Sequence, residues 1–230
     1  MVFRQLFDSE SSTYTYLLAD RRGGEALIID PVLENVGQYL AVIEELDLQL
    51  VMAVDTHVHA DHVSGASSLR DSTRCTYAMG QQTRAECLTH SFSDDDSLVI
   101  GAMELRAIYT PGHTDDSYCF VMQDRVFTGD TLLIRGTGRT DFQNGDPGAQ
   151  YDSIFNRLLT LPEDMLVYPA HDYAGHTCSS IYEEKHYNPR LQVDSRQQYI
   201  EQMNALQLDK PRKIDIAVPA NIHCGSREAA

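Results

Sequence analysis

Six consecutive residues, His57-Val58-His59-Ala60-Asp61-His62, constrain this chain more than any other segment. They place three imidazoles and one carboxylate directly after the apolar run Leu50–Val54, which predicts a buried strand. Neutral imidazole nitrogens and carboxylate oxygens are the usual protein ligands of Zn and Fe. A loop that is histidine-rich by chance is the alternative. We expect instead a fold that holds metal ligands where a strand ends.

Three further segments place a potential metal ligand after a predicted strand. His113 follows the strand 104–109, Asp130 follows 126–127 and His171 follows 165–168. A rigid sheet can hold such loop residues in position. Taken alone, each is also explained as a polar residue that ends a strand or closes a turn. Four junctions of the same kind in one chain favour a shared metal site.

The composition restricts partners and compartment. A formal net charge of -16 argues against nucleic acid or an anionic membrane as a partner, because the charges repel. There is no apolar run of about 18 residues, the minimum for a transmembrane helix. Five cysteines without a Cys-x-x-Cys pair predict reduced thiols in a cytosol-like compartment. Bacterial cytosol is the expected location, and a mitochondrial protein without its transit peptide also fits.

The spacing of apolar residues predicts a mixed α and β fold. We expect two mixed β-sheets packed face to face with helices outside. The expected arrangement is a single domain over residues 1–230, with a short C-terminal helical extension over about 176–230. Strands are predicted over 3–7, 14–18, 26–29, 48–54, 75–79, 98–100, 104–109, 118–122, 126–127 and 165–168. Helices are predicted over 35–46, 60–69, 150–159, 178–186 and 194–206.

The order of the metal-ligand motifs resembles the metallo-β-lactamase superfamily. The motifs are His-x-His-x-Asp-His, Pro-Gly-His-Thr, Gly-Asp and a late His, and they span residues 57–171. This resemblance implies an αββα sandwich with the metal site at one edge. Most members are hydrolases in which two metals share a hydroxide. The chain contains the ligands of such a site: His57, His59, His113 and Asp130 for one metal, and Asp61, His62, Asp130 and His171 for the other.

A more extensive resemblance rests on eight segments: Arg4-Gln5, Asp30–Val32, Thr56–His62, Leu132–Gln143, Tyr168–Tyr173, Asn188–Leu191, Val218–Asn221 and Cys224-Gly225. These segments resemble the persulfide dioxygenases, also called sulfur dioxygenases, of that superfamily. This resemblance covers nearly the whole chain. It implies a mononuclear Fe(II) dioxygenase that oxidises glutathione persulfide with O2 and water to sulfite and glutathione, in hydrogen sulfide catabolism.

The same resemblance implies roles for individual residues. One Fe(II) per chain is bound by His57, His113 and Asp130, a 2-His-1-carboxylate arrangement with positions open for substrate and O2. Around the ligands lie residues that orient them and line the pocket, namely His59, Asp61, His62 and His171. Arg135 and Arg139 are expected to bind carboxylates of glutathione, and Tyr173 to face the pocket. An Arg139–Asp141 ion pair and simple packing of Tyr173 are the alternatives.

Other functions stay open at this stage. A dinuclear thioester hydrolase of the glyoxalase II type uses the same ligands, although the segment after His171 resembles the dioxygenases. A flavodiiron-type reductase is disfavoured, because His59 stands where a Glu is expected. A non-catalytic metal-binding protein leaves unexplained why ligands follow four strands. The sequence decides neither between monomer and homodimer nor what Cys224 does.

Overall fold

The structure, a computed structural model, describes residues 1–223 and divides into two compact units. Unit 1 comprises residues 1–92, 97–104 and the chain from 210 onward, and unit 2 comprises 93–96 and 105–209. The single domain predicted from the sequence stays a prediction. Cys224 and Gly225 lie outside the described residues.

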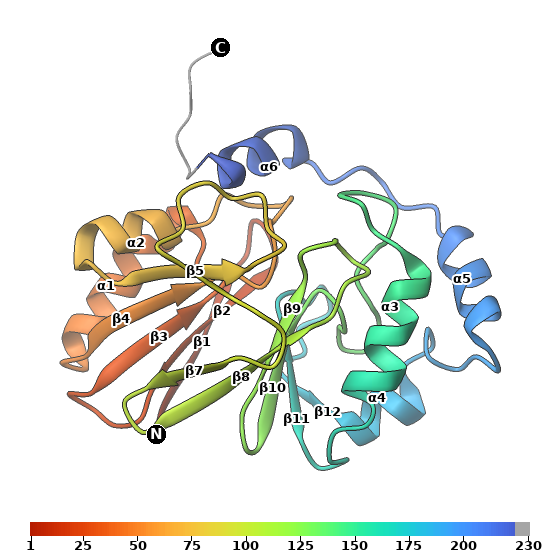
Figure 1. The fold of residues 1–230 in the computed structure, drawn as a ribbon, viewed down its shortest axis with the longest axis horizontal. Coiled ribbons are helices and arrows are strands. Elements are labelled where there is room, and N and C mark those ends of the chain that lie inside the picture. Colours follow the sequence, from red (N-terminus) through yellow and green to blue (C-terminus); the bar gives the residue numbers. More distant parts are fainter. Residues whose placement is uncertain (224–230) are drawn as a thin grey trace. The chain divides into compact units, whose positions relative to one another are not determined.

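Unit 1 is built on a six-stranded mixed sheet of order β1-β2-β3-β4-β5-β6 (Figure 1). The pairs β1–β2 and β2–β3 are antiparallel. The pairs β3–β4, β4–β5 and β5–β6 are parallel. Because parallel strands end at the same edge of a sheet, the residues that follow β3 and β4 are neighbours. The strands are β1 (Val2–Asp8), β2 (Thr13–Ala19), β3 (Glu25–Ile29), β4 (Gln49–Val54), β5 (Thr76–Gly80) and β6 (His90–Phe92), and β7 (Ser97–Ile100) lies in the same unit.

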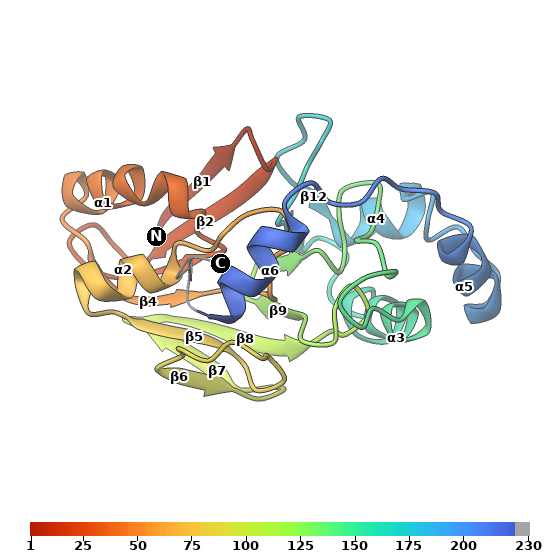
Figure 2. The ribbon, with the colours of Figure 1, turned by 90° about the horizontal axis from the view of Figure 1, so that it is seen from above.

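Helices α1 (Val36–Glu45) and α2 (Ala66–Thr73) lie side by side along this sheet (Figure 2). Tyr39 and Ile43 are one turn apart on α1, and both enter the apolar core formed with Ile28 of β3. A 3-10 turn (Leu33–Asn35) precedes α1, and α6 (Ile214–Ile222) adds its residue Ile222 to the same core. No helix in the described part of the chain has the length and apolar character that crossing a membrane requires.

Unit 2 contains a second mixed sheet, in which consecutive strands have the order β12-β11-β10-β9-β8. Only β10 and β11 are parallel, so the residues that follow these two strands meet at one edge. Ile154 and Tyr199 pack with Val126 and Val167 of the sheet in one buried core. The strands are β8 (Met103–Tyr109), β9 (Tyr118–Val121), β10 (Arg125–Gly129), β11 (Leu166–Pro169) and β12 (Ser179–Ser180). The helices are α3 (Pro147–Ser153), continued by a π-helical turn (Ile154–Leu158), α4 (Ile181–Tyr187) and α5 (Arg196–Asn204).

Every strand predicted from the sequence is confirmed to within two residues. The helix predicted over 60–69 is wrong in its first half, since α2 begins only at Ala66. The backbone before α2 is bound to another loop instead, because Leu33 N donates to Val63 O at 2.9 Å and Gly65 N donates to Pro31 O at 2.6 Å. The short strands β6 and β12 and helix α6 were not predicted from the sequence.

The cysteines correct a second expectation. Cys75, Cys119 and Cys178 are free, as predicted, but Cys87 is disulfide-bonded. The prediction of reduced thiols throughout is therefore wrong at Cys87. Spacing along the chain did not reveal the bond, because a disulfide depends on which residues the fold brings within reach.

Candidate metal centre

In unit 1, Asp30 organises the edge where β3 and β4 end. The backbone N–H of Asp30 donates to Val54 O at 2.9 Å, which aligns the two strand ends. Asp30 is buried and has a φ of 51°, a left-handed conformation that Asp adopts more readily than most residues. Its carboxylate accepts hydrogen bonds from Thr56 N at 2.7 Å and from Thr56 Oγ1 at 3.0 Å.

The Thr56 hydroxyl connects this carboxylate to His57. Because Thr56 Oγ1 donates its one proton to Asp30, it must accept from Nδ1 of His57, 3.0 Å away. In the neutral form of the buried His57 ring the proton is then on Nδ1 and the lone pair on Nε2. A histidine held in this way is in the form that binds a metal.

His59 contacts two buried carboxylates. Its Nε2 lies 3.1 Å from Asp30 Oδ1 and 3.9 Å from Asp55 Oδ1. Burial raises the pKa of Asp30 to about 6 and also raises the pKa of Asp55. Ser64 Oγ and Tyr77 OH donate to the other oxygen of Asp55 at 2.6 and 2.8 Å. Sequence reasoning missed Asp55, which follows β4 two residues before His57 but belongs to no motif.

Asp61 and His62 contact each other. Nδ1 of His62 lies 2.8 Å from Asp61 Oδ2, which also accepts from Thr13 Oγ1 at 3.1 Å. From α6, Asn221 Nδ2 donates to the backbone oxygens of His59 and His62, both at 2.9 Å. Asn221 lies in the Val-Pro-Ala-Asn motif that the sequence singled out, and its contacts show that it holds the histidine segment in place.

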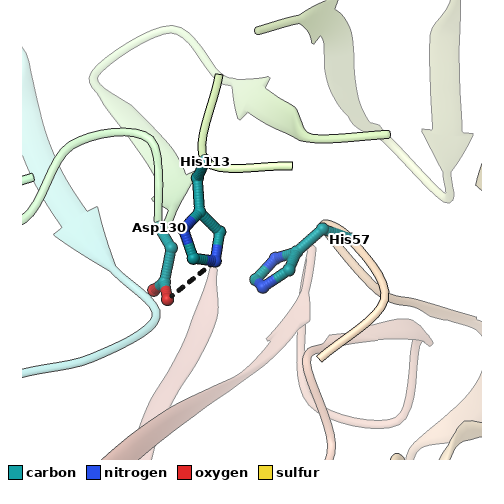
Figure 3. Close-up of side chains that lie close together, drawn as sticks. All are labelled: His57, His113 and Asp130. Carbon is teal, nitrogen blue, oxygen red and sulfur yellow. Dashed lines mark ion pairs between the residues drawn. The ribbon is translucent and has the colours of Figure 1, made fainter. Parts of the chain in front are cut away.

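In unit 2, Asp130 and His171 meet at the edge where the parallel strands β10 and β11 end. Ala170 N donates to Gly129 O at 3.0 Å, which sets the register of the two loops. Nδ1 of His171 lies 2.6 Å from Asp130 Oδ1. The other carboxylate oxygen, Oδ2, lies 3.5 Å from Nε2 of His113 (Figure 3).

The other nitrogen of His113 determines what Nε2 can do. Nδ1 lies 2.7 Å from the backbone oxygen of Arg139, which can only accept, so Nδ1 is the donor. In the neutral ring Nε2 then presents a lone pair toward Asp130 Oδ2. Two acceptor atoms that face each other are stabilised by a cation between them, so this pair fits a metal ion.

Two glycines make this arrangement possible. A Cβ on Gly138 would lie 2.2 Å from Asp130 O and 2.7 Å from Nδ1 of His113, so no side chain fits there. Gly112, just before His113, has a φ of 142°, and a Cβ would lie 2.3 Å from Gln150 Cα. Both positions require glycine because backbone approaches so closely.

The three residues predicted to contact substrate lie as follows. The Arg139 guanidinium donates to both oxygens of Asp141, at 2.6 and 2.7 Å. This is the ion pair considered above as the alternative to substrate binding by Arg139. The Arg135 guanidinium pairs with buried Glu184 and with Glu183 at 2.6 Å. Tyr173 is 76% exposed, and its ring lies nearly parallel to that of His171 with centroids 6.1 Å apart. Their contacts with substrate stay predictions.

Comparison with known proteins places the chain in a family. The sequence model of the metallo-beta-lactamase superfamily matches residues 9–171. The chain therefore belongs to the metallo-β-lactamase superfamily, and the predicted fold class is confirmed.

Within this superfamily the similarity extends over nearly the whole chain. "Persulfide dioxygenase ETHE1, mitochondrial" of Mus musculus is 46% identical over 98% of this chain and 89% of that protein, and its Homo sapiens counterpart is 45% identical over the same shares. The crystal structure of ETHE1 from Myxococcus xanthus is 50% identical, with a TM-score of 0.96 over 98% of this chain and 100% of that one. The chain belongs to the persulfide dioxygenase family.

Proposed function

We propose that this protein is an Fe(II)-dependent persulfide dioxygenase that oxidises glutathione persulfide with O2 and water to sulfite and glutathione. The dioxygenase activity follows from the family, whose members match nearly the entire chain. Iron as the metal, its ligands and glutathione as the carrier thiol are the parts that need their own test.

We assign the iron to His57 of unit 1 and to His113 and Asp130 of unit 2, the ligands that the resemblance to the persulfide dioxygenases implies. The observation that supports this assignment is the hydrogen bond made by Nδ1 in each of the two histidine rings. Nδ1 of each histidine is directed to a fixed acceptor, Thr56 Oγ1 or Arg139 O, so both Nε2 atoms keep a lone pair. Two imidazoles and one carboxylate are the ligand set of non-haem Fe(II) oxygenases.

When bound, Fe(II) supplies the redox chemistry that activation of O2 requires and that side chains lack. The chain's own residues orient the ligands and bind the substrate. His171 donates to Asp130 Oδ1, which holds the carboxylate so that Oδ2 is left for the metal. Tyr173, exposed beside His171, offers a hydroxyl to the polar part of the substrate. To bind glutathione, Arg135 and Arg139 would each have to release the carboxylate of the chain with which they now pair and bind a carboxylate of glutathione instead.

The deciding experiment is the metal content of protein purified without added metal, together with O2 uptake on glutathione persulfide. About one iron per chain with sulfite formation supports the proposal. Two metals per chain, with hydrolysis of S-lactoylglutathione and no O2 uptake, would identify a dinuclear thioester hydrolase instead. His57→Ala and His113→Ala should each lose iron, whereas His186→Ala, at an exposed histidine of α4, should keep it.

A further inference from the structure

We propose that Gln150 of α3 and Tyr199 of α5 are positioning residues for His113, acting through the backbone of residues 138 and 139. The proposal rests on the metal-binding role of His113 proposed above. Neither residue belongs to a metal-ligand motif.

Gln150 and Tyr199 form a buried chain of hydrogen bonds that ends at the loop after Asp130. The side chains of both are completely buried. Tyr199 OH donates to Gln150 Oε1 at 2.8 Å, and Gln150 Nε2 donates to Gly138 O at 3.0 Å. Burial raises the pKa of Tyr199 to about 12, so its hydroxyl stays protonated and able to donate.

The segment that Gln150 holds is the one that orients His113. Gly138 N donates to Asp130 O at 2.8 Å, and its Cα has no room for a side chain beside the His113 ring. The next residue, Arg139, provides the backbone oxygen that accepts from Nδ1 of His113 at 2.7 Å. A shift of residues 138 and 139 therefore moves the Gly138 backbone beside the His113 ring. It also moves Arg139 O, the acceptor that fixes the tautomer of His113.

Gln150 also contacts the segment directly before His113. The backbone of Gly112, directly before His113, packs on Gln150 Cα so closely that a Cβ would lie 2.3 Å away. On the same helix, Ser153 Oγ donates to Pro111 O at 2.7 Å, and just before it Asp146 N donates to Gly112 O at 2.9 Å. One residue of α3 thus contacts both segments that flank the proposed ligand.

The effect of a buried chain of hydrogen bonds depends on whether all of its members are present. With every donor and acceptor satisfied, it fixes one arrangement, and with one member removed the remaining polar groups are left buried without a partner. Gly138 O would then move toward another donor, and Arg139 O would move with it. Residues that orient metal ligands in this way typically change metal affinity about 10- to 100-fold when they are replaced.

Gln150→Met tests the proposal, because methionine has a similar shape but no hydrogen-bonding amide. We expect the Fe(II) dissociation constant to rise about tenfold or more, and Tyr199→Phe to raise it by a smaller factor. Ile154→Val is the matched control, since Ile154 is equally buried four residues further along but contacts neither loop segment by a hydrogen bond. It should lower the melting temperature by a few degrees without changing iron affinity.

A second measurement needs no metal. In apo-protein labelled with ¹⁵N-histidine, NMR should show His113 protonated on Nδ1 in the wild type and a mixture of tautomers in Gln150→Met. Wild-type iron affinity and an unchanged tautomer in both Gln150→Met and Tyr199→Phe would overturn the proposal. Because the tautomer is read without metal, a failure of the iron or dioxygenase assignment is distinguishable from a failure of the positioning role.

Discussion

His171→Ala separates a one-metal site from a two-metal site. The substitution removes the hydrogen bond of 2.6 Å between Nδ1 of His171 and Oδ1 of Asp130. In the mononuclear proposal His171 only orients a ligand, so the variant should still bind about one iron per chain at saturation. In a dinuclear hydrolase His171 is itself a ligand of the second metal, and the variant would bind one metal fewer.

The expected loss of affinity follows from the contact. A short hydrogen bond to an ionised carboxylate contributes about 1.5–3 kcal/mol. The side chains of His171 and Asp130 are only 2% and 13% exposed, so water replaces the bond poorly. Since about 1.4 kcal/mol corresponds to a factor of ten, the Fe(II) dissociation constant should rise roughly 10- to 100-fold.

The assay is an anaerobic titration of metal-free protein with Fe(II) against a competing chelator, which gives stoichiometry and affinity in one experiment. His186→Ala serves as the control, because this exposed histidine donates to Tyr182 O of its own helix. An affinity equal to that of the wild type would refute the reasoning about Asp130. A fall from two bound metals to one would refute the mononuclear assignment.

Three further substitutions test other parts of the site. Asp130→Asn should lose iron and O2 uptake together. The control Asp141→Asn, at an exposed carboxylate paired with Arg139, should retain iron and O2 uptake. If Asp130→Asn keeps iron and O2 uptake, Asp130 is not a ligand. Thr56→Val removes the hydroxyl between Asp30 and His57, so urea unfolding should show a loss of about 1–3 kcal/mol and iron titration a weaker site, and unchanged iron affinity would contradict the connection. Tyr173→Phe should raise the KM for glutathione persulfide at unchanged iron content, and an unchanged KM would remove the hydroxyl from the substrate site.

The sequence predicted the parts of this protein that local patterns determine. Buried strands have an apolar signature that depends only on neighbouring residues, and the candidate ligands follow four of them, so both were found. The roles of Asp55 and Gln150 depend on contacts with residues far along the chain, and no local pattern marks such contacts. The helix predicted from residue 60 was wrong for the same reason, since pairing with residues 31–33 overrode the local preference.

The motif shared with the hydrolases makes Asp130 the residue on which the number of metals depends. In the dinuclear alternative its carboxylate would be a ligand of both metals, whereas in the mononuclear proposal it would bind one. In this chain Oδ1 accepts a hydrogen bond from His171, and Oδ2 lies 3.5 Å from Nε2 of His113. In the mononuclear proposal His171 orients this carboxylate through Nδ1, whereas in the dinuclear alternative His171 would itself be a ligand of the second metal. The metal stoichiometry of His171→Ala is therefore the measurement that decides between the two sites, because it separates a residue that orients Asp130 from a residue that binds a second metal.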